Sequence, residues 1–395
     1  MRNGKAGSYP QEVWKTAAAI IQRVKQDGDA AVLAYSKTLD GQTLTTGQMA
    51  ISQAQCRNAL RTLTPELKQA LTVSAERIRA FNAKIRPKNV SWSDGFAEFS
   101  WRWTPIESVG VYVPGGTAAY PSSVLMGVIP AKMAGSRVVV CTPPKPSAAV
   151  LAACALAKVD AVFQIGGAQA IAAMAYGTKS MAKVDKIVGP GGAFVDAAKR
   201  LCAKDVAIDF PAGPTELVAV AGSDADAGQV AADLVAQAEH DVRAKIGMYA
   251  LDKKMADAVK NAIGKKSKKT RRFAIVAQSL QNALLQVVNE TQVEEILNAG
   301  AFEHVALYGK AAKLAGKIRN AGAVYVDTPP ALGDYALGSN HVLPTGGFAK
   351  SAGMLSVFDF IKPVVTIRRT KKGLEKTAIA IAKSEGLWAH ADSLE

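Results

Sequence analysis

The sequence predicts an α/β protein with two Rossmann-like domains, each built on a parallel sheet, and a small C-terminal extension. From Pro105 onward, short runs of β-branched residues alternate with helix-like stretches of about ten residues, the pattern of repeated strand–helix–strand units. Several of these runs end in glycines, as strands do at the ligand-binding edge of an open α/β sheet. The length of 395 residues allows two or three such domains.

The N-terminal part is predicted to be helical. Residues 13–24 and 60–85 carry apolar side chains at three-to-four spacing among Lys, Gln and Glu. The pattern changes at Pro105. Strands are then expected at 109–113, 137–141, 161–165 and 184–188, and helices at 124–134, at 148–157 and after Gly167.

The glycine-rich turns do not form the Gly-x-Gly-x-x-Gly fingerprint with an acidic residue about twenty positions later. A dinucleotide would therefore bind without the usual motif. A second α/β region is expected at 217–355, and we group it with 1–108 as one domain, with 109–216 as the other. Residues 356–395, with a strand at 364–367 and a helix at 373–383, form a small segment that contributes to the site.

Composition indicates a globular protein of the cytoplasm. Hydrophobic residues make up 49% and charged residues 21% of the chain, and no apolar run reaches the ~18 residues of a membrane span. No secretory signal is visible, and the four cysteines form no Cys-x-x-Cys pair, which indicates reduced thiols. We expect a cytoplasmic protein with no membrane partner.

The net charge of +15 is concentrated in two basic runs, at 265–272 and 368–372. A basic patch can bind nucleic acid, but no aromatic stacking residue is interleaved with either run. We favour a solvated surface that attracts anionic metabolites, and expect no nucleic-acid partner.

All four histidines lie beside carboxylates or amides. Gln237 and His240 are three apart in a helical stretch, so both side chains share one face and could present O and N to a metal. Asp334 is expected in a loop, and His390 lies near the C-terminus. These four would suit a zinc ion with an open position for substrate.

Glu303 and His304 are adjacent, and in a loop both could point into a cleft. A histidine beside a carboxylate is a candidate general base near pH 7. The alternative is a solvated pair at a helix end.

Seven stretches of the sequence, in one order, match the pattern of a known family. They are 109–116 (VGVYVPGG), 120–135 (YPSSVLM and IPAKMAG), 166–173 (GGAQAIAA), 184–191 (VDKIVGPG), 212–216 (AGPTE), 231–240 (AADLVAQAEH) and 333–345 (GDY through NHVLPT). With these stretches the sequence resembles the histidinol dehydrogenase family over nearly its whole length.

The resemblance implies one zinc ion per subunit, held by Gln237, His240, Asp334 and His390, and acid–base chemistry by Glu303 and His304. It also implies a symmetric homodimer with shared active sites. It places Tyr112, Gln169 and position 192 near NAD. The residues implied for the substrate are Thr215, His341 and Glu385, together with Gln237, His240, His304, Asp334 and His390.

The chain departs from the family pattern at two places. Gly192 stands where an asparagine that contacts NAD is usual, and residues 301–306 read AFEHVA rather than APEHLE. Thr215 replaces the commoner serine and keeps its hydroxyl.

The implied activity is the NAD-linked oxidation of L-histidinol, through histidinal, to L-histidine, the last step of histidine biosynthesis. One alternative is the oxidation of another primary alcohol, such as sulfopropanediol, by the same residues. Others are a zinc-binding homologue that has lost catalysis and, more distantly, a nucleic-acid binder.

Overall fold

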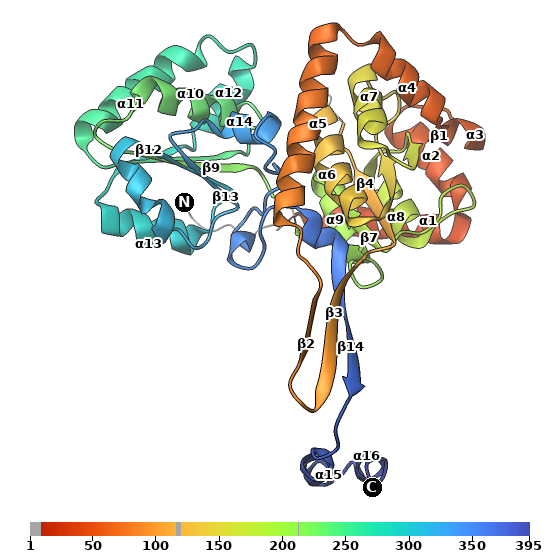
Figure 1. Ribbon diagram of the computed structural model, residues 1–395. Coiled ribbons are helices and arrows are strands. Elements are labelled where there is room, and N and C mark those ends of the chain that lie inside the picture. The colour runs from red at the N-terminus through yellow and green to blue at the C-terminus, as the bar shows by residue number, and fades with distance from the viewer. Residues whose placement is uncertain (1–8, 116–119, 212) are drawn as a thin grey trace.

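A computed structural model describes residues 9–115, 120–211 and 213–395. Two α/β units lie side by side, and a narrow three-stranded stalk extends from between them to two small C-terminal helices (Figure 1). The mixed α/β class with two largely parallel sheets is as predicted from the sequence. No helix in the described part of the chain is long and apolar enough to cross a membrane.

The first unit contains a six-stranded sheet in the order β1-β6-β5-β4-β7-β8. Its strands are parallel except β1, which pairs antiparallel with β6. β4 is at the centre and ends at Tyr112. The strands are β1 (Ala50–Ile51), β4 (Ser108–Tyr112), β5 (Arg137–Cys141), β6 (Ala161–Phe163), β7 (Lys186–Val188) and β8 (Ala207–Ile208).

Helices cover both faces of this sheet. Those within the unit are α6 (Pro121–Ala134), α7 (Ala148–Ala157), α8 (Gly167–Tyr176) and α9 (Ala193–Cys202). The N-terminal helices are α1 (Gln11–Asp27), α2 (Asp29–Leu39), α3 (Thr46–Met49), α4 (Gln53–Thr62) and α5 (Pro65–Ile85). The amphipathic helices α1 and α5 each bury one apolar stripe against this unit, as the three-to-four spacing predicts.

The packing of the N-terminal helices differs from our grouping of 1–108 with 217–355. α1 packs on α8 and α9, α4 on α7, and α5 on α6, all in the first unit. Residues such as Ile20 and Val24 of α1 are buried in the same core as Ile171. Helix periodicity shows which face is apolar but not which sheet it covers, so the grouping was wrong.

The second unit contains a parallel five-stranded sheet in the order β11-β10-β9-β12-β13. Its strands are β9 (Glu216–Ala221), β10 (Lys245–Ala250), β11 (Leu284–Val287), β12 (His304–Tyr308) and β13 (Ala323–Val326). Its helices are α10 (Ala227–Ala238), α11 (Lys253–Ser267), α12 (Phe273–Leu280), α13 (Glu290–Gly300), η1 (Gly309–Lys317) and α14 (Pro330–Tyr335). Two short turns, η2 (Phe348–Lys350) and η3 (Val357–Phe360), lead back toward the first unit.

The stalk is a three-stranded antiparallel sheet, β14-β3-β2. It consists of β2 (Val90–Ser93), β3 (Ala97–Pro105) and β14 (Ile361–Arg369), and is followed by α15 (Glu375–Ser384) and α16 (Trp388–Asp392). β14 pairs with β3 from Ile361 opposite Pro105 to Arg369 opposite Ala97. The strand and helix expected after residue 356 are both present, but the β2–β3 hairpin was not predicted.

Candidate active site

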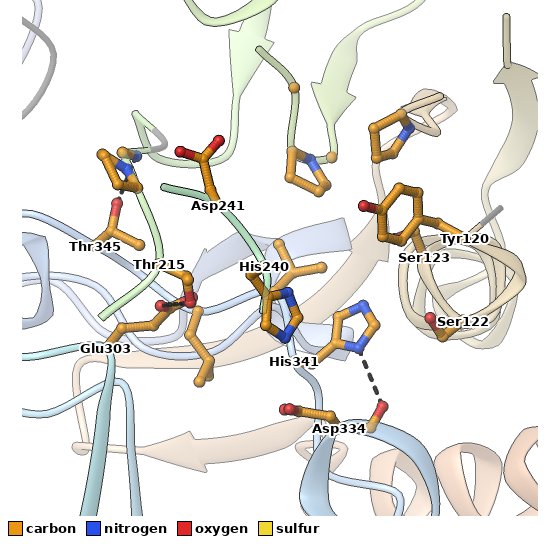
Figure 2. A pocket seen from close by; sticks show the side chains of 18 of the residues that line it. Tyr120, Ser122, Ser123, Thr215, His240, Asp241, Glu303, Asp334, His341 and Thr345 are labelled. Carbon is orange, nitrogen blue, oxygen red and sulfur yellow. Dashed lines mark hydrogen bonds between the residues drawn. The ribbon is translucent and has the colours of Figure 1, made fainter. Parts of the chain in front are cut away.

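A cavity of about 480 Å³ opens between the two units. The first unit contributes Pro114, Gly115 and the turn of residues 189–192, at the carboxyl ends of β4 and β7. The second unit contributes acidic, amide and imidazole side chains (Figure 2). These polar residues are Thr215, Gln237, His240, Asp241, Glu303, His304, Asp334, His341 and Thr345.

Glu303 immediately precedes β12, and its side chain is 9% exposed. Its Oε2 atom accepts hydrogen bonds from the Thr215 hydroxyl at 2.6 Å and from the Glu216 backbone N–H at 2.7 Å. Both donors lie at the start of the neighbouring strand β9, so the register of β12 on β9 fixes the carboxylate. Two donors hold an ionised carboxylate in one orientation.

His304 is the first residue of β12, not part of a loop as we expected, and only 4% of its side chain is exposed. Its Nδ1 atom lies 3.1 Å from the Glu216 carbonyl oxygen, and Nε2 lies 3.4 Å from Oδ1 of Asp334. Because a carbonyl only accepts, Nδ1 must carry a hydrogen, which leaves Nε2 to exchange a proton. The ring also stacks on Tyr325.

Burial disfavours a charged imidazole, but Glu303 and Asp334 outweigh it and raise the pKa of His304 to about 10. That value is above the near-neutral range expected from the sequence, because a second carboxylate, Asp334, faces the ring. Both members of the Glu303–His304 pair are buried. The alternative of a solvated pair at a helix end is therefore excluded.

Three of the four expected metal ligands border this cavity: Gln237, His240 and Asp334. Gln237 is buried near the end of α10, and its amide nitrogen donates to the Thr215 hydroxyl. The amide oxygen is thus the atom of Gln237 suited to a cation. His240 lies two residues beyond the end of α10 and is exposed to the cavity.

Asp334 was expected in a loop but lies in the short helix α14, where it is buried. Its carbonyl oxygen is 3.0 Å from Nδ1 of His341, which also lines the cavity. Burial lowers the pKa of His341, so this ring favours the neutral form.

The C-terminal residues expected at the site are elsewhere in this chain. Glu385 and His390 are exposed on the segment of α15 and α16, at the far end of the stalk (Figure 1). One chain therefore brings together Gln237, His240 and Asp334, but not His390. In the described ranges no cluster of three or more His, Cys, Asp or Glu side chains could hold a metal by itself.

On the first unit, Gly192 lines the cavity as the residue that precedes α9. Tyr112 and Gln169 are buried behind it and do not line the cavity. The Tyr112 hydroxyl accepts a hydrogen bond from the Gly167 N–H, and the Gln169 amide donates to Asp40. Proximity of Tyr112 and Gln169 to NAD stays a prediction.

Sequence reasoning did not single out Glu216, although its backbone contacts both Glu303 and His304. Its carboxylate accepts hydrogen bonds from Lys245, at the start of β10, and from the N–H of Gly346, which follows the cavity residue Thr345. The sequence feature that could have identified Glu216 is its position directly after Thr215 in the AGPTE stretch.

A cleft between two parallel-sheet units, with a buried carboxylate–imidazole pair at strand ends, defines an enzyme of the α/β class. Residues 5–395 match the histidinol dehydrogenase family, and the chain belongs to that family. It is 42% identical over 397 residues to histidinol dehydrogenase from Rhizobium meliloti, covering 97% of this chain and 92% of that one. The identity to the Methanosarcina barkeri protein of the same name is 41% over 407 residues, covering 98% and 92%.

Comparison with solved structures also finds a member of this family. The crystal structure of histidinol dehydrogenase from Elizabethkingia anophelis superposes with a TM-score of 0.92 at 31% identity, covering 98% of this chain and 95% of that chain. Succinate-semialdehyde dehydrogenase from Burkholderia pseudomallei, at 14% identity and a TM-score of 0.53, covers 90% of this chain and 86% of its own. That second likeness shows a shared fold alone.

Proposed function

We propose that this protein oxidises L-histidinol to L-histidine with two molecules of NAD, using one zinc ion per site. The observation that carries the proposal is the buried Glu303–His304 pair, beside Gln237, His240 and Asp334 at one cavity. Membership of the family supports the choice of substrate. A cytoplasmic location stays a prediction.

The three cavity residues fit a zinc ion chemically. They offer an amide oxygen, an imidazole nitrogen and a carboxylate oxygen, all of which zinc accepts. The Gln237 amide nitrogen donates its hydrogen bond to Thr215, so the amide oxygen is the atom that can bind the metal. A fourth ligand, His390, would come from a second copy of the chain.

When bound, zinc would hold the imidazole and amine of the substrate as a Lewis acid and would offset the charge of Asp334 that raises the pKa of His304. In the first step, Nε2 of His304 takes the proton of the alcohol, and NAD, when bound, would accept the hydride of the carbinol carbon, which leaves the aldehyde. The Nδ1 hydrogen bond to Glu216 keeps the ring oriented during this transfer.

In the second step, the Glu303 carboxylate takes a proton from water, and the water oxygen adds to the aldehyde carbon. Because Glu303 keeps the proton of the water, the hydrate is formed as its anion, and it would become the carboxylic acid on loss of a hydride, which a second NAD would accept when bound. Thr215 and the Glu216 N–H hold Glu303 in place for this role. Enclosure between the two units would keep the aldehyde bound between steps.

A homodimer with shared sites is part of the proposal. α15 has no buried residue, and the C-terminal segment exposes several large apolar side chains: Leu374, Ile381, Leu387, Trp388 and Leu394. A second apolar surface, on α5 and around α14, borders a further cavity of about 510 Å³ that His240 and Asp334 also line. Among the residues that line this cavity, Leu67 and Tyr335 are large apolar side chains that are exposed.

Two exposed apolar surfaces on one chain favour mutual burial in a symmetric dimer. If α16 of one copy covered the second cavity of the other, His390 and Glu385 of the partner subunit would reach the site. The two exposed apolar surfaces therefore support the expectation that Glu385 and His390 belong to a site shared between subunits.

A single assay tests the proposed activity. NADH production should be measured with histidinol, with sulfopropanediol and without substrate, using the zinc-loaded protein. We expect NADH with histidinol only, at two NADH per histidinol consumed. NADH with the sulfonated diol alone would replace the substrate, and bound zinc without NADH from either alcohol would favour a binding protein that has lost catalysis.

A further inference from the structure

A buried ion pair lies directly beneath the glycine turn of residues 189–192. The Lys199 ammonium, on α9, pairs with the Asp209 carboxylate, which follows β8. Their side chains are 1% and 2% exposed, so both charges are removed from water. Neither belongs to the acid–base or metal set described above.

Both members of the pair bind the same glycine. Lys199 Nζ donates to the Gly189 carbonyl oxygen at 2.9 Å, and Asp209 Oδ2 accepts from the Gly189 N–H at 2.8 Å. The peptide groups on both sides of Gly189 are thus fixed by charge-assisted hydrogen bonds.

Gly189 itself accepts no side chain. Its φ is +115°, and a Cβ atom added there would lie 2.2 Å from the Tyr112 carbonyl oxygen. The turn is therefore clamped between the end of β4 on one side and the Lys199–Asp209 pair on the other. From this clamp the chain runs through Pro190 and Gly191 to Gly192, all of which line the 480 Å³ cavity.

Stability alone does not explain such a pair. Desolvating two charges costs about as much as their attraction returns, and apolar residues of similar volume often serve equally well. What apolar residues could not do is bind the N–H and the carbonyl oxygen of Gly189 together. The pair is suited to fixing the position of this turn.

We propose that Lys199 and Asp209 are positioning residues that hold the turn of residues 189–192 in the conformation that receives the dinucleotide. This inference rests on the proposed use of NAD at this side of the cavity. It predicts that neutralising the pair weakens the binding of NAD, while the acid–base residues and the proposed metal ligands, none of which lies in the first unit, keep their function.

The test compares two double variants. Lys199→Met/Asp209→Asn neutralises the pair, and the asparagine oxygen can still accept the Gly189 N–H. Arg200→Met/Asp196→Asn is the matched control, because that ion pair lies on the same helix and is largely buried, and neither residue lines the cavity. NADH affinity, KM for NAD, kcat at saturating NAD and zinc content are measured for each.

We expect Lys199→Met/Asp209→Asn to bind NADH about tenfold more weakly and to show a KM for NAD about tenfold higher, the size of one or two lost hydrogen bonds. Its kcat and zinc content should stay within about twofold of the unmutated values. The control should keep its NADH affinity. Unchanged affinity in the first variant, or an equal loss in the control, would overturn the inference.

The two failures can be told apart. If the unmutated protein binds no NADH, the proposed cofactor is wrong; if it binds NADH and the variant binds it equally, the positioning role is wrong. If the variant does not fold, the inference can still be tested by amide hydrogen exchange of the unmutated protein. Amide hydrogen exchange over residues 186–192 should already be slow without NADH, and exchange at the rate of an unfolded chain would refute a fixed turn.

Discussion

The Thr215 hydroxyl donates a 2.6 Å hydrogen bond to the Glu303 carboxylate, although the two residues are 88 positions apart in the chain. The same hydroxyl accepts a hydrogen bond from the Gln237 amide. One oxygen thus connects a proposed acid–base residue to a proposed metal ligand.

Replacing Thr215 tests this connection. Thr215→Ser should keep the activity, because serine offers the same hydroxyl. Thr215→Val should lower kcat by about tenfold or more, since Glu303 loses one of its two donors and the Gln237 amide is left without an acceptor. Steady-state kinetics of both variants would show the difference, and a valine variant with the serine variant's kcat would refute the role of the hydroxyl.

The metal assignment predicts linked losses. His240→Ala should lower both bound zinc and activity. The loss should exceed the ~10–100-fold that is typical when a residue hydrogen-bonded to a metal ligand is replaced. Zinc is measured by elemental analysis of the purified protein. Gln229→Ala is the control on α10, the helix that leads to His240, because Gln229 does not line the cavity. Unmutated zinc content in His240→Ala would contradict the assignment.

The acid–base pair predicts effects on separate steps. His304→Ala should slow the first hydride transfer by about 10²–10⁴-fold while zinc stays bound, because a positioned base is removed. Glu303→Gln should instead slow the oxidation of aldehyde to acid. Supplying histidinal directly and recording NADH isolates that second half. Oxidation of histidinal by Glu303→Gln at the unmutated rate would show that Glu303 does not activate the water.

Much of the fold was predictable because it depends on local pattern. The strand at 137–141 and the helix at 148–157 were predicted with the observed boundaries, since each is a short β-branched or alanine-rich run bounded by turn residues. The β2–β3 hairpin was not predicted. β2 is exposed and β3 is at most half-buried, and β3 pairs with β14 some 260 residues later, so neither strand shows the regular alternation of buried and exposed residues that marks a strand on a core.

The site was predictable as a set of residue types and not as a geometry. Glu303 and His304 were identified as a pair, but their contacts with Glu216 arise from the pairing of β12 with β9, and the approach of Asp334 to His304 arises from the position of α14. The carboxylates of Glu303 and Asp334 raise the pKa of His304. The Lys199–Asp209 pair was missed for the same reason, because nothing local marks a lysine as buried.

Gly192 allows a gain-of-affinity test. Its φ is −68°, which any residue adopts, and an added Cβ atom would meet nothing within 4 Å. Gly192→Asn should therefore fold normally and tighten NAD binding by roughly threefold to tenfold, the value of about one hydrogen bond. Gly189→Ala, by contrast, should destabilise the protein because its Cβ would collide with the Tyr112 backbone. Unchanged or weaker NAD binding in Gly192→Asn would mean that another group already fills that place.

The shared site of the proposed dimer can be tested by complementation. Two inactive variants, His304→Ala and His390→Ala, are dissociated together and reassociated. If His390 serves the partner's site, each heterodimer has one site with both lesions and one with neither. Equal random mixing makes about half of the dimers mixed, so about a quarter of the normal sites should regain activity.

The control for this experiment mixes His304→Ala with Glu303→Gln. These two lesions lie in the same unit of the chain, so every site of a heterodimer keeps one of them and no activity should return. Mass spectrometry of the intact dimers establishes that heterodimers have formed in both mixtures. Heterodimers of His304→Ala and His390→Ala without regained activity would contradict the exchange, because His390 would then act in the site of its own chain, to which the stalk would have to fold back.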